Sequence, residues 1–146
     1  MRGDDEGTAA WAALLRVHAA VVPKLERELR AARNLSLAWY DVLLVLNAAP
    51  GRRLRMQDLA TAAVLSRTRI SRVVVELTAA GLVRREADPA DRRSSFAALT
   101  TAGRNTLRAA APFYLQSIAD HFTRHLTNEE VALVRTALQK VRDAEE

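Results

Sequence analysis

A helix, a tight turn and a second helix are predicted between residues 57 and 81, and this pattern constrains the fold more than any other feature of the chain. Apolar residues begin a short helix near Gln57. Ser66 suits the N-cap of the second helix, and Gly81 supplies the left-handed position that ends it after Ala80. Four apolar residues then recur at the spacing of one buried helix face: Ile70, Val73, Val74 and Leu77.

The opposite face of this second helix is polar and cationic. It carries Thr68, Ser71, Arg72 and Val75, with Arg67 and Arg69 near the exposed N-terminal end that Ser66 caps. Arginine at a helix N-terminus opposes the helix dipole, so these cations do not favour helix stability. In a DNA major groove the same side chains can read base edges and hold phosphates. The alternative is an ordinary solvated helix face.

A charged β-hairpin is predicted directly after the two helices. Residues 82–86 and 95–99 can form short strands, and the Asp-Pro pair and polar residues between them form the tip. Arg92 and Arg93 lie at this tip, where arginine can enter the negative minor groove of DNA. Asp91 can pair with an arginine and stiffen the loop. By itself such a tip is solvated surface, but after a helix-turn-helix it reads as a wing.

The positive charge of the chain is concentrated in this central region. The chain of 146 residues has a net charge of +5, yet residues 51–108 carry +7 and the remainder carries −2. Every cation in the central segment is arginine, whose planar guanidinium suits phosphate and guanine edges. Genome composition is an alternative explanation for arginine over lysine, but it does not explain the division of charge.

The central motifs occur in an order that resembles the MarR family of bacterial transcriptional regulators. The matching residues are Leu59-Ala60, Ser66, Ser71-Arg72, Leu77, the run from Gly81 to Arg85, the run from Asp88 to Arg93, and the run from Leu99 to Gly103. Upstream, Leu35-Ser36 and the run from Tyr40 to Leu43 also resemble that family. The resemblance implies a winged helix-turn-helix in each subunit of a homodimer, a recognition helix from Ser66 to Ala80, and Asp91 with Arg93 as the wing pair.

The flanking segments are predicted to be helices. Apolar residues recur at helical spacing over residues 8–33, 100–125 and 127–143. Pro23 is expected to kink the first of these helices or break it in two, and Pro112 is expected to kink the second. Ser36 suits the N-cap of a further helix over 37–48. We therefore expect a mainly α fold with a small β-hairpin wing. Residues 1–146 form a single MarR-type domain, with 35–103 the DNA-binding region and 8–34 and 104–146 the dimerisation helices.

The resemblance implies a sequence-specific regulator, expected here to be a repressor that binds a pseudo-palindromic operator in double-stranded DNA as a homodimer. A small aromatic or phenolic ligand would release it. Candidate ligand-binding residues are Trp11, His18, Trp39 and Tyr40. For His18 the alternative is a packed interface histidine, and for Trp39 and Tyr40 it is a place in the core.

Other function classes are disfavoured by what the sequence lacks. It has no Gly-rich phosphate loop and no catalytic triad motif, and His121 and His125 suggest no third metal ligand, so neither an enzyme nor a metal or cofactor site is expected. Without cysteine, thiol sensing is excluded. An acidic N-terminus and only short uncharged stretches predict no export signal and no membrane span, hence a cytoplasmic protein. The resemblance implies that it is bacterial and nucleoid-associated. The alternatives that stay open are an architectural DNA-binding protein of low specificity and a protein-interaction module.

Overall fold

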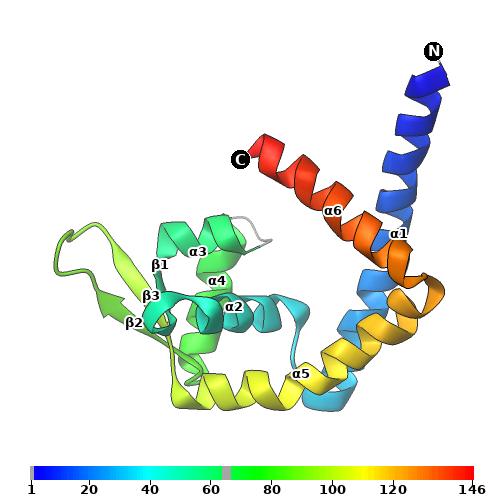
Figure 1. Ribbon diagram of the computed structural model, residues 1–146. Helices are drawn as coiled ribbons and strands as arrows, with labels where there is room; N and C mark the ends of the chain where they lie inside the picture. Colours follow the sequence, from blue (N-terminus) through cyan, green and yellow to red (C-terminus); the bar gives the residue numbers. More distant parts are fainter. Residues whose placement is uncertain (1, 64–66) are drawn as a thin grey trace. The chain divides into compact units, whose positions relative to one another are not determined.

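The computed structural model describes residues 2–63 and 67–146 and shows six α-helices, two 3-10 helices and three β-strands (Figure 1). The helices are α1 (Arg2–Arg33), α2 (Leu37–Ala48), α3 (Met56–Ala62), α4 (Arg67–Ala79), α5 (Thr101–His121) and α6 (Asn128–Glu145), with 3-10 helices η1 (Pro50–Arg52) and η2 (Thr123–His125). The strands are β1 (Arg53–Arg55), β2 (Val83–Ala87) and β3 (Ser95–Leu99). The predicted mainly α fold with a small β-hairpin wing is confirmed.

The chain divides into two compact units. The winged unit comprises Leu29–Pro112, and the terminal unit comprises the chain up to Glu28 together with Phe113–Glu146. The boundaries fall inside α1 and α5, so each of these helices begins in one unit and ends in the other. The helix-turn-helix and the sheet belong entirely to the winged unit.

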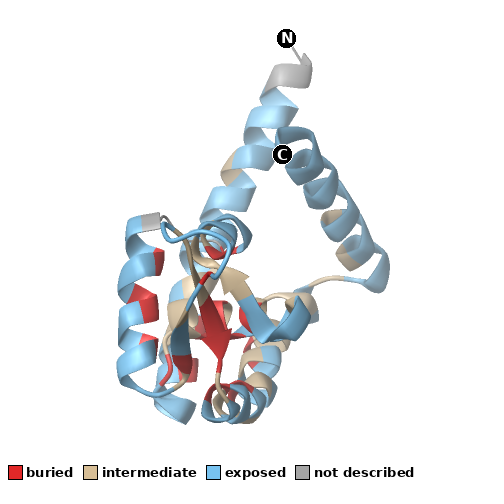
Figure 2. Ribbon diagram, turned by 90° about the vertical axis from the view of Figure 1, so that its left-hand side faces the viewer, coloured by how far each residue is buried: buried red, intermediate tan, exposed pale blue. Residues whose placement is uncertain are grey.

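The core of the winged unit comes from the apolar faces of α2, α3 and α4 against the sheet. The side chains most completely excluded from solvent include Leu43, Leu46, Leu59, Val74 and Leu77, each 0% exposed. The predicted buried face of α4 is confirmed, because Ile70, Val73, Val74 and Leu77 are all buried. Figure 2 shows the buried residues in red gathered in the winged unit, beneath the exposed face that α4 presents.

The helices of the winged unit end where the sequence predicted. The Ser36 hydroxyl accepts the backbone N–H of Trp39 at 3.1 Å and caps α2, and Pro50-Gly51 follow its C-terminus in η1. Gly81 adopts φ +76° after α4, where an L side chain would be strained. The N–H groups of Gly81 and Leu82 then donate to the carbonyls of Thr78 and Leu77, which is a Schellman motif. This turn delivers the chain directly into β2.

The sheet has three antiparallel strands in the order β1-β3-β2. The predicted hairpin of β2 and β3 pairs Val83 with Leu99 and Ala87 with Ser95. Strand β1 was not predicted from the sequence. Its three residues, Arg53 to Arg55, are too few and too charged to show an alternating apolar pattern, yet they add to the edge of β3, with Arg55 opposite Phe96.

A tight junction joins the end of β3 to the start of α5. The backbone N–H of Thr100 donates to the Leu82 carbonyl, and its hydroxyl donates to the Gly81 carbonyl and accepts the N–H of Gly103. A Cβ at Gly103 would overlap the Leu82 carbonyl oxygen and lie 2.7 Å from Leu99 Cδ1. Only glycine fits at this crossing of the α4–β2 turn and α5.

The terminal unit is built from long helices with little core of their own. Both α1 and α5 run through their prolines, Pro23 and Pro112, as single helices, so of the two outcomes predicted for Pro23, a kink or a break, the break does not occur. The loss of one backbone donor is small beside the remaining hydrogen bonds of helices of 32 and 21 residues. A capping box between Thr127 and Glu130 starts α6. In the part of the chain that the structure covers, no helix combines the length and the apolarity that crossing a bilayer requires.

Candidate nucleic-acid interface

The exposed face of α4 carries the polar residues that the sequence predicted there. Thr68, Arg69, Ser71, Arg72 and Val75 are all exposed, while the opposite face is buried. Ser66 lies outside the described residues, and Arg67 is described as the first residue of α4. The helix therefore presents a continuous polar and cationic surface because its apolar face is fixed in the core.

Arg72 keeps its positive charge uncompensated. Glu76 lies four residues after it on the same helix, a spacing that commonly gives an ion pair. Instead, a Glu76 carboxylate oxygen accepts a hydrogen bond from Trp39 Nε1 on α2 at 3.0 Å. Within the described residues, Arg72 forms no ion pair, so its guanidinium is available to an external anion.

The wing loop, residues 88–94, connects β2 to β3 and carries two exposed arginines at its tip. The Asp91 carboxylate accepts the backbone N–H of Arg93 at 2.9 Å, and the Asp91 carbonyl accepts the N–H of Ser94 at 3.1 Å. The predicted pairing of Asp91 with an arginine guanidinium is wrong, because its carboxylate closes the loop through the backbone. Across the described chain, the guanidinium groups of Arg92 and Arg93 have no acidic partner.

The acid that does pair with an arginine is Asp88, at the start of the wing loop. Its side chain is 2% exposed, and one oxygen accepts Arg55 Nε at 2.9 Å while the other accepts the N–H of Ala90 at 2.9 Å. The Ala90 N–H and the Arg55 guanidinium, helped by Ser94, lower the pKa of Asp88. This pairing of Arg55 with Asp88 was not predicted from the sequence, because the two residues lie 33 positions apart in the chain.

Two of the three arginines at the base of the wing share one carboxylate, whereas those at its tip have no acidic partner among the described residues. Glu86 accepts hydrogen bonds from Arg84 Nε at 2.9 Å and from Arg53 Nη1 at 3.2 Å, and these two contacts lower the pKa of Glu86. Arg85 donates to the Ser95 hydroxyl. Glu86 therefore offsets one positive charge at the base of the wing, while Arg92 and Arg93 at the tip keep both of theirs.

A groove of about 530 Å³ lies between α4 and the wing. Ser71 lines it from α4, and Arg85, Asp91, Arg93, Ser94 and Ser95 line it from the wing. Met56, Gln57, Ala60 and Ile70 complete the lining. The polar face of α4 and the wing arginine thus border one concave surface, an arrangement able to follow a curved polyanion.

Comparison with known proteins places this geometry in a family. Residues 33–94 match the model of the MarR family. The transcriptional regulator HosA of Escherichia coli is 32% identical over 111 residues, covering 76% of this chain and 80% of HosA. Sco3205 of Streptomyces coelicolor, a MarR family transcriptional regulator solved in complex with DNA, is 30% identical with a TM-score of 0.88, covering 97% of this chain and 89% of Sco3205. The chain belongs to the MarR family.

A second similar structure concerns ligand control. BpsR of Bordetella bronchiseptica, whose DNA binding is regulated by 6-hydroxynicotinic acid, is 25% identical with a TM-score of 0.80, covering 90% of this chain and 91% of BpsR. Members of the MarR family are transcriptional regulators, so this chain is a DNA-binding regulator and not an enzyme.

The four candidate ligand residues of this MarR-family chain fall into two pairs. Trp11 and His18 belong to the terminal unit, where Trp11 is 60% exposed and His18 lines an apolar groove. Trp39 and Tyr40 belong to the winged unit, where Trp39 donates to Glu76 and Tyr40 is buried in the core at 5% exposure. Their role in ligand binding stays a prediction.

His121, at the end of α5, contacts a carboxylate of α1. His121 Nε2 lies 2.7 Å from a Glu28 carboxylate oxygen on α1, and Ser117 donates to the other oxygen. These contacts, Ser117 first, lower the pKa of Glu28. In the chain as described, no three His, Asp or Glu side chains lie close enough together to share a metal ion.

Proposed function

We propose that this MarR-family regulator binds a pseudo-palindromic operator as a homodimer, with α4 in the major groove and the wing in the flanking minor groove. The observation that carries the proposal is the set of guanidinium groups without an acidic partner in the described residues, Arg72 on α4 and Arg92 and Arg93 on the wing, beside a groove that Ser71 of α4 and Arg93 of the wing line together. The DNA complex of Sco3205 supports the same use of the shared fold.

On α4, the roles divide between positioning and reading. Arg67, Arg69 and Arg72 hold phosphates or guanine edges, while Ser66, Thr68 and Ser71 hydrogen-bond to bases or the backbone. The burial of Ile70 and Val74 fixes which side of the helix meets DNA. Two such helices about 34 Å apart read half-sites separated by about one helical turn.

On the wing, Arg93 enters the minor groove with Arg92 beside it, and Asp91 shapes the loop. The bond from the Arg93 N–H to Asp91 orders the tip in the free protein, which reduces the entropy lost on binding. The minor groove attracts arginine most strongly where it is narrow. The wing therefore contributes affinity and a preference for the shape of the flanking sequence.

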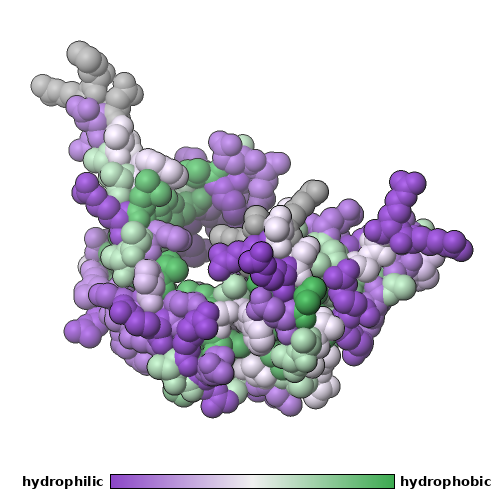
Figure 3. Space-filling model, turned by 180° about the vertical axis from the view of Figure 1, so that it is seen from behind, coloured by the Kyte–Doolittle hydropathy of each residue, from purple (hydrophilic) through white to green (hydrophobic). Residues whose placement is uncertain are grey.

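The homodimer is formed by the terminal unit. In its described part Leu25 is the one buried apolar side chain, whereas large apolar residues remain exposed. They are Trp11, Leu14, Leu15, Val17, Phe113, Leu115, Leu133, Leu138 and Val141. Figure 3 shows hydrophobic atoms gathered where α1 meets α6. A second copy would cover this surface, since monomers rarely expose large apolar patches.

Repression follows if the operator overlaps a promoter, because the bound dimer then occludes RNA polymerase in the bacterial cytoplasm. A small aromatic effector would release it by binding better to a dimer whose α4 helices are wrongly spaced for DNA. The BpsR precedent and the aromatic and histidine side chains of Trp11, His18, Trp39 and Tyr40 support an aromatic acid as the effector class.

A fluorescence anisotropy titration at about 150 mM salt tests the specific-binding proposal. The probe is a labelled duplex that contains the inverted repeat upstream of the gene, and random duplex is the competitor. A specific regulator should prefer the repeat by about 10³ or more, whereas an architectural protein gives a ratio near one. A ratio near one would refute the proposed function, and the absence of salt-dependent binding would favour a protein-interaction module.

The wing assignment is tested with Arg93→Ala, using Arg135→Ala on α6 as the control arginine. Arg93→Ala should remain folded and bind DNA more weakly. If Arg93 contacts a phosphate, the slope of the logarithm of affinity against the logarithm of salt concentration should become shallower by about one. Unchanged affinity for Arg93→Ala, or an equal loss for Arg135→Ala, would reject the role of the wing.

A further inference from the structure

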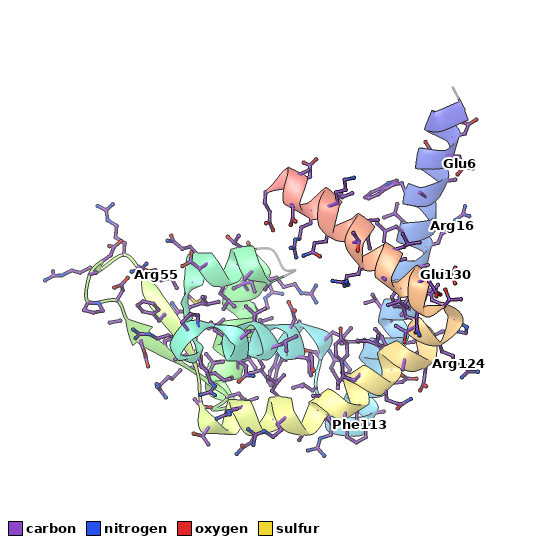
Figure 4. The ribbon with its side chains drawn as sticks, in the orientation of Figure 1. Glu6, Arg16, Arg55, Phe113, Arg124 and Glu130 are labelled. Atoms are coloured by element: carbon purple, nitrogen blue, oxygen red, sulfur yellow. The ribbon has the colours of Figure 1, made fainter. Side chains whose placement is uncertain are left out.

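The ion pair between Arg55 and Asp88 differs from the other ion pairs of the sheet in how deeply its carboxylate is buried. Arg55 is the last residue of β1 and directly precedes α3, and Asp88 directly follows β2 at the start of the wing loop. The Arg55 side chain is 43% exposed, but the Asp88 side chain is 2% exposed. Figure 4 shows Arg55 between the beginning of α3 and the wing.

Asp88 connects Arg55 to the backbone of the wing loop. Its second carboxylate oxygen accepts the N–H of Ala90, and its carbonyl accepts the N–H of Asp91 at 3.3 Å. Asp91 in turn accepts the N–H of Arg93. A continuous series of hydrogen bonds therefore runs from the residue that precedes α3 to the arginine at the wing tip.

The Arg55 guanidinium also stacks on the sheet. Its carbon lies 5.3 Å from the centre of the Phe96 ring, on the strand that leaves the wing loop. Arg55 thus contacts both ends of the wing, Asp88 where the loop begins and Phe96 just after β3 starts. A planar guanidinium can make both contacts at once, because it donates in its plane and stacks on its face.

We propose that Arg55 is a positioning residue for DNA binding, which sets the wing relative to the helix-turn-helix through Asp88. This inference rests on the proposed role of the wing arginines. Without Arg55, the almost buried Asp88 carboxylate loses its cation, and an unpaired buried charge is costly. Asp88 then turns toward water, and the loop that it holds moves with it. The width of the groove that Ser71 and Arg93 line is then no longer fixed.

Arg53 provides a matched control within the same strand. Its guanidinium carbon lies 4.5 Å from the centre of the same Phe96 ring, and it pairs with Glu86 at 3.2 Å. Glu86, however, lies within β2 and is also held by Arg84. Removing Arg53 therefore changes the charge of β1 and the stacking on Phe96 without releasing the wing loop.

The test measures the affinity of Arg55→Gln and of Arg53→Gln for the labelled duplex that contains the inverted repeat. Each substitution is made in the wild-type protein and in the double variant Arg92→Ala/Arg93→Ala. Arg55→Gln should weaken binding by about tenfold, the size of one lost specific contact. Arg53→Gln should weaken it much less. In the Arg92→Ala/Arg93→Ala background, Arg55→Gln should have no further effect, because a positioning residue acts only through the side chains that it positions.

The same measurements distinguish the ways in which the inference can fail. If Arg92→Ala/Arg93→Ala binds as wild type, the proposed role of the wing is wrong. If that variant loses affinity but Arg55→Gln weakens binding further in its background, Arg55 contacts DNA directly and the positioning role is refuted. An equal loss for Arg53→Gln would also refute it, since charge on β1 would then suffice.

A second variant and a second readout guard against a simple folding defect. Asp88→Asn keeps an oxygen to accept the Ala90 N–H but removes the charge that holds Arg55, so it should reproduce the affinity loss of Arg55→Gln. Hydroxyl-radical cleavage of the bound operator should show protection lost only at the flanking minor grooves in both variants. Loss of protection over the whole site, or full flanking protection, would overturn the inference.

Discussion

Substitution of Gly103 by alanine should destabilise the winged unit, although alanine is the better helix former. Gly103 lies in the first turn of α5, and an added Cβ would overlap the Leu82 carbonyl oxygen and press on Leu99 Cδ1 at 2.7 Å. Leu82 has little freedom to retreat, because its N–H closes the Schellman motif after α4 and its carbonyl accepts the Thr100 N–H. The backbone must therefore move as a unit.

The expected cost of Gly103→Ala is about 3 kcal/mol in the free energy of unfolding. Overpacking costs about 1–3 kcal/mol, and the upper end applies here because the added Cβ meets a backbone oxygen that cannot turn away. A broken hydrogen bond to Leu82 adds about 1 kcal/mol. The higher helix propensity of alanine offsets about 1 kcal/mol of this cost. For a chain of this size the midpoint of thermal unfolding should fall by about 10 °C.

Gly7→Ala is the matched control, because Gly7 lies within α1 and a Cβ there would meet nothing within 4 Å. It should gain about 1 kcal/mol from helix propensity alone. Thermal and urea unfolding, followed by circular dichroism at one fixed protein concentration, compares the two variants. The reasoning is refuted if Gly103→Ala melts at or above the wild-type temperature, or if both variants shift in the same direction.

Three further predictions concern other parts of the structure. Leu77 is 0% exposed, so Leu77→Ala should lower the free energy of unfolding in urea by about 2–5 kcal/mol. Val75 is 64% exposed, so Val75→Ala should change it by no more than about 0.5 kcal/mol. Equal effects would contradict the burial of this face of α4. Thr127→Ala should cost about 1 kcal/mol by removing the acceptor of the Glu130 N–H, and Thr127→Ser should not; equal losses would argue against capping. Because the pKa of Asp88 is lowered in the fold, its contribution to stability is complete above about pH 4 and is lost as the pH falls further. The melting temperature of Asp88→Asn should therefore decline less steeply below about pH 4 than that of the wild type. Parallel declines of the two proteins would contradict this.

Much of the winged unit could be predicted because its signals are local. The spacing of Ile70, Val73, Val74 and Leu77 places them on one face whatever the rest of the chain does, and Gly81 marks the end of that helix in its own conformation. Ser36 likewise caps α2 through a bond that spans three residues. Such features depend on neighbours in sequence, so periodicity and capping rules find them.

The features that could not be predicted depend on contacts between distant residues. Asp88 and Asp91 both flank the Pro89-Ala90 turn, and only the approach of Arg55 from β1 determines that Asp88 is the buried one. Strand β1 is defined by pairing with β3 rather than by its own composition.

The bond between Trp39 and Glu76 gives this protein a built-in optical reporter of its DNA-reading helix. The indole of Trp39 on α2 is held to a carboxylate of α4, one helical turn beyond Arg72, so any shift of α4 against α2 alters the electric field around the indole. The other tryptophan, Trp11, lies in the terminal unit and is 60% exposed. A Trp11→Phe protein would therefore emit from Trp39 alone, and the movement of α4 on meeting an operator or an effector could be followed without attaching a dye.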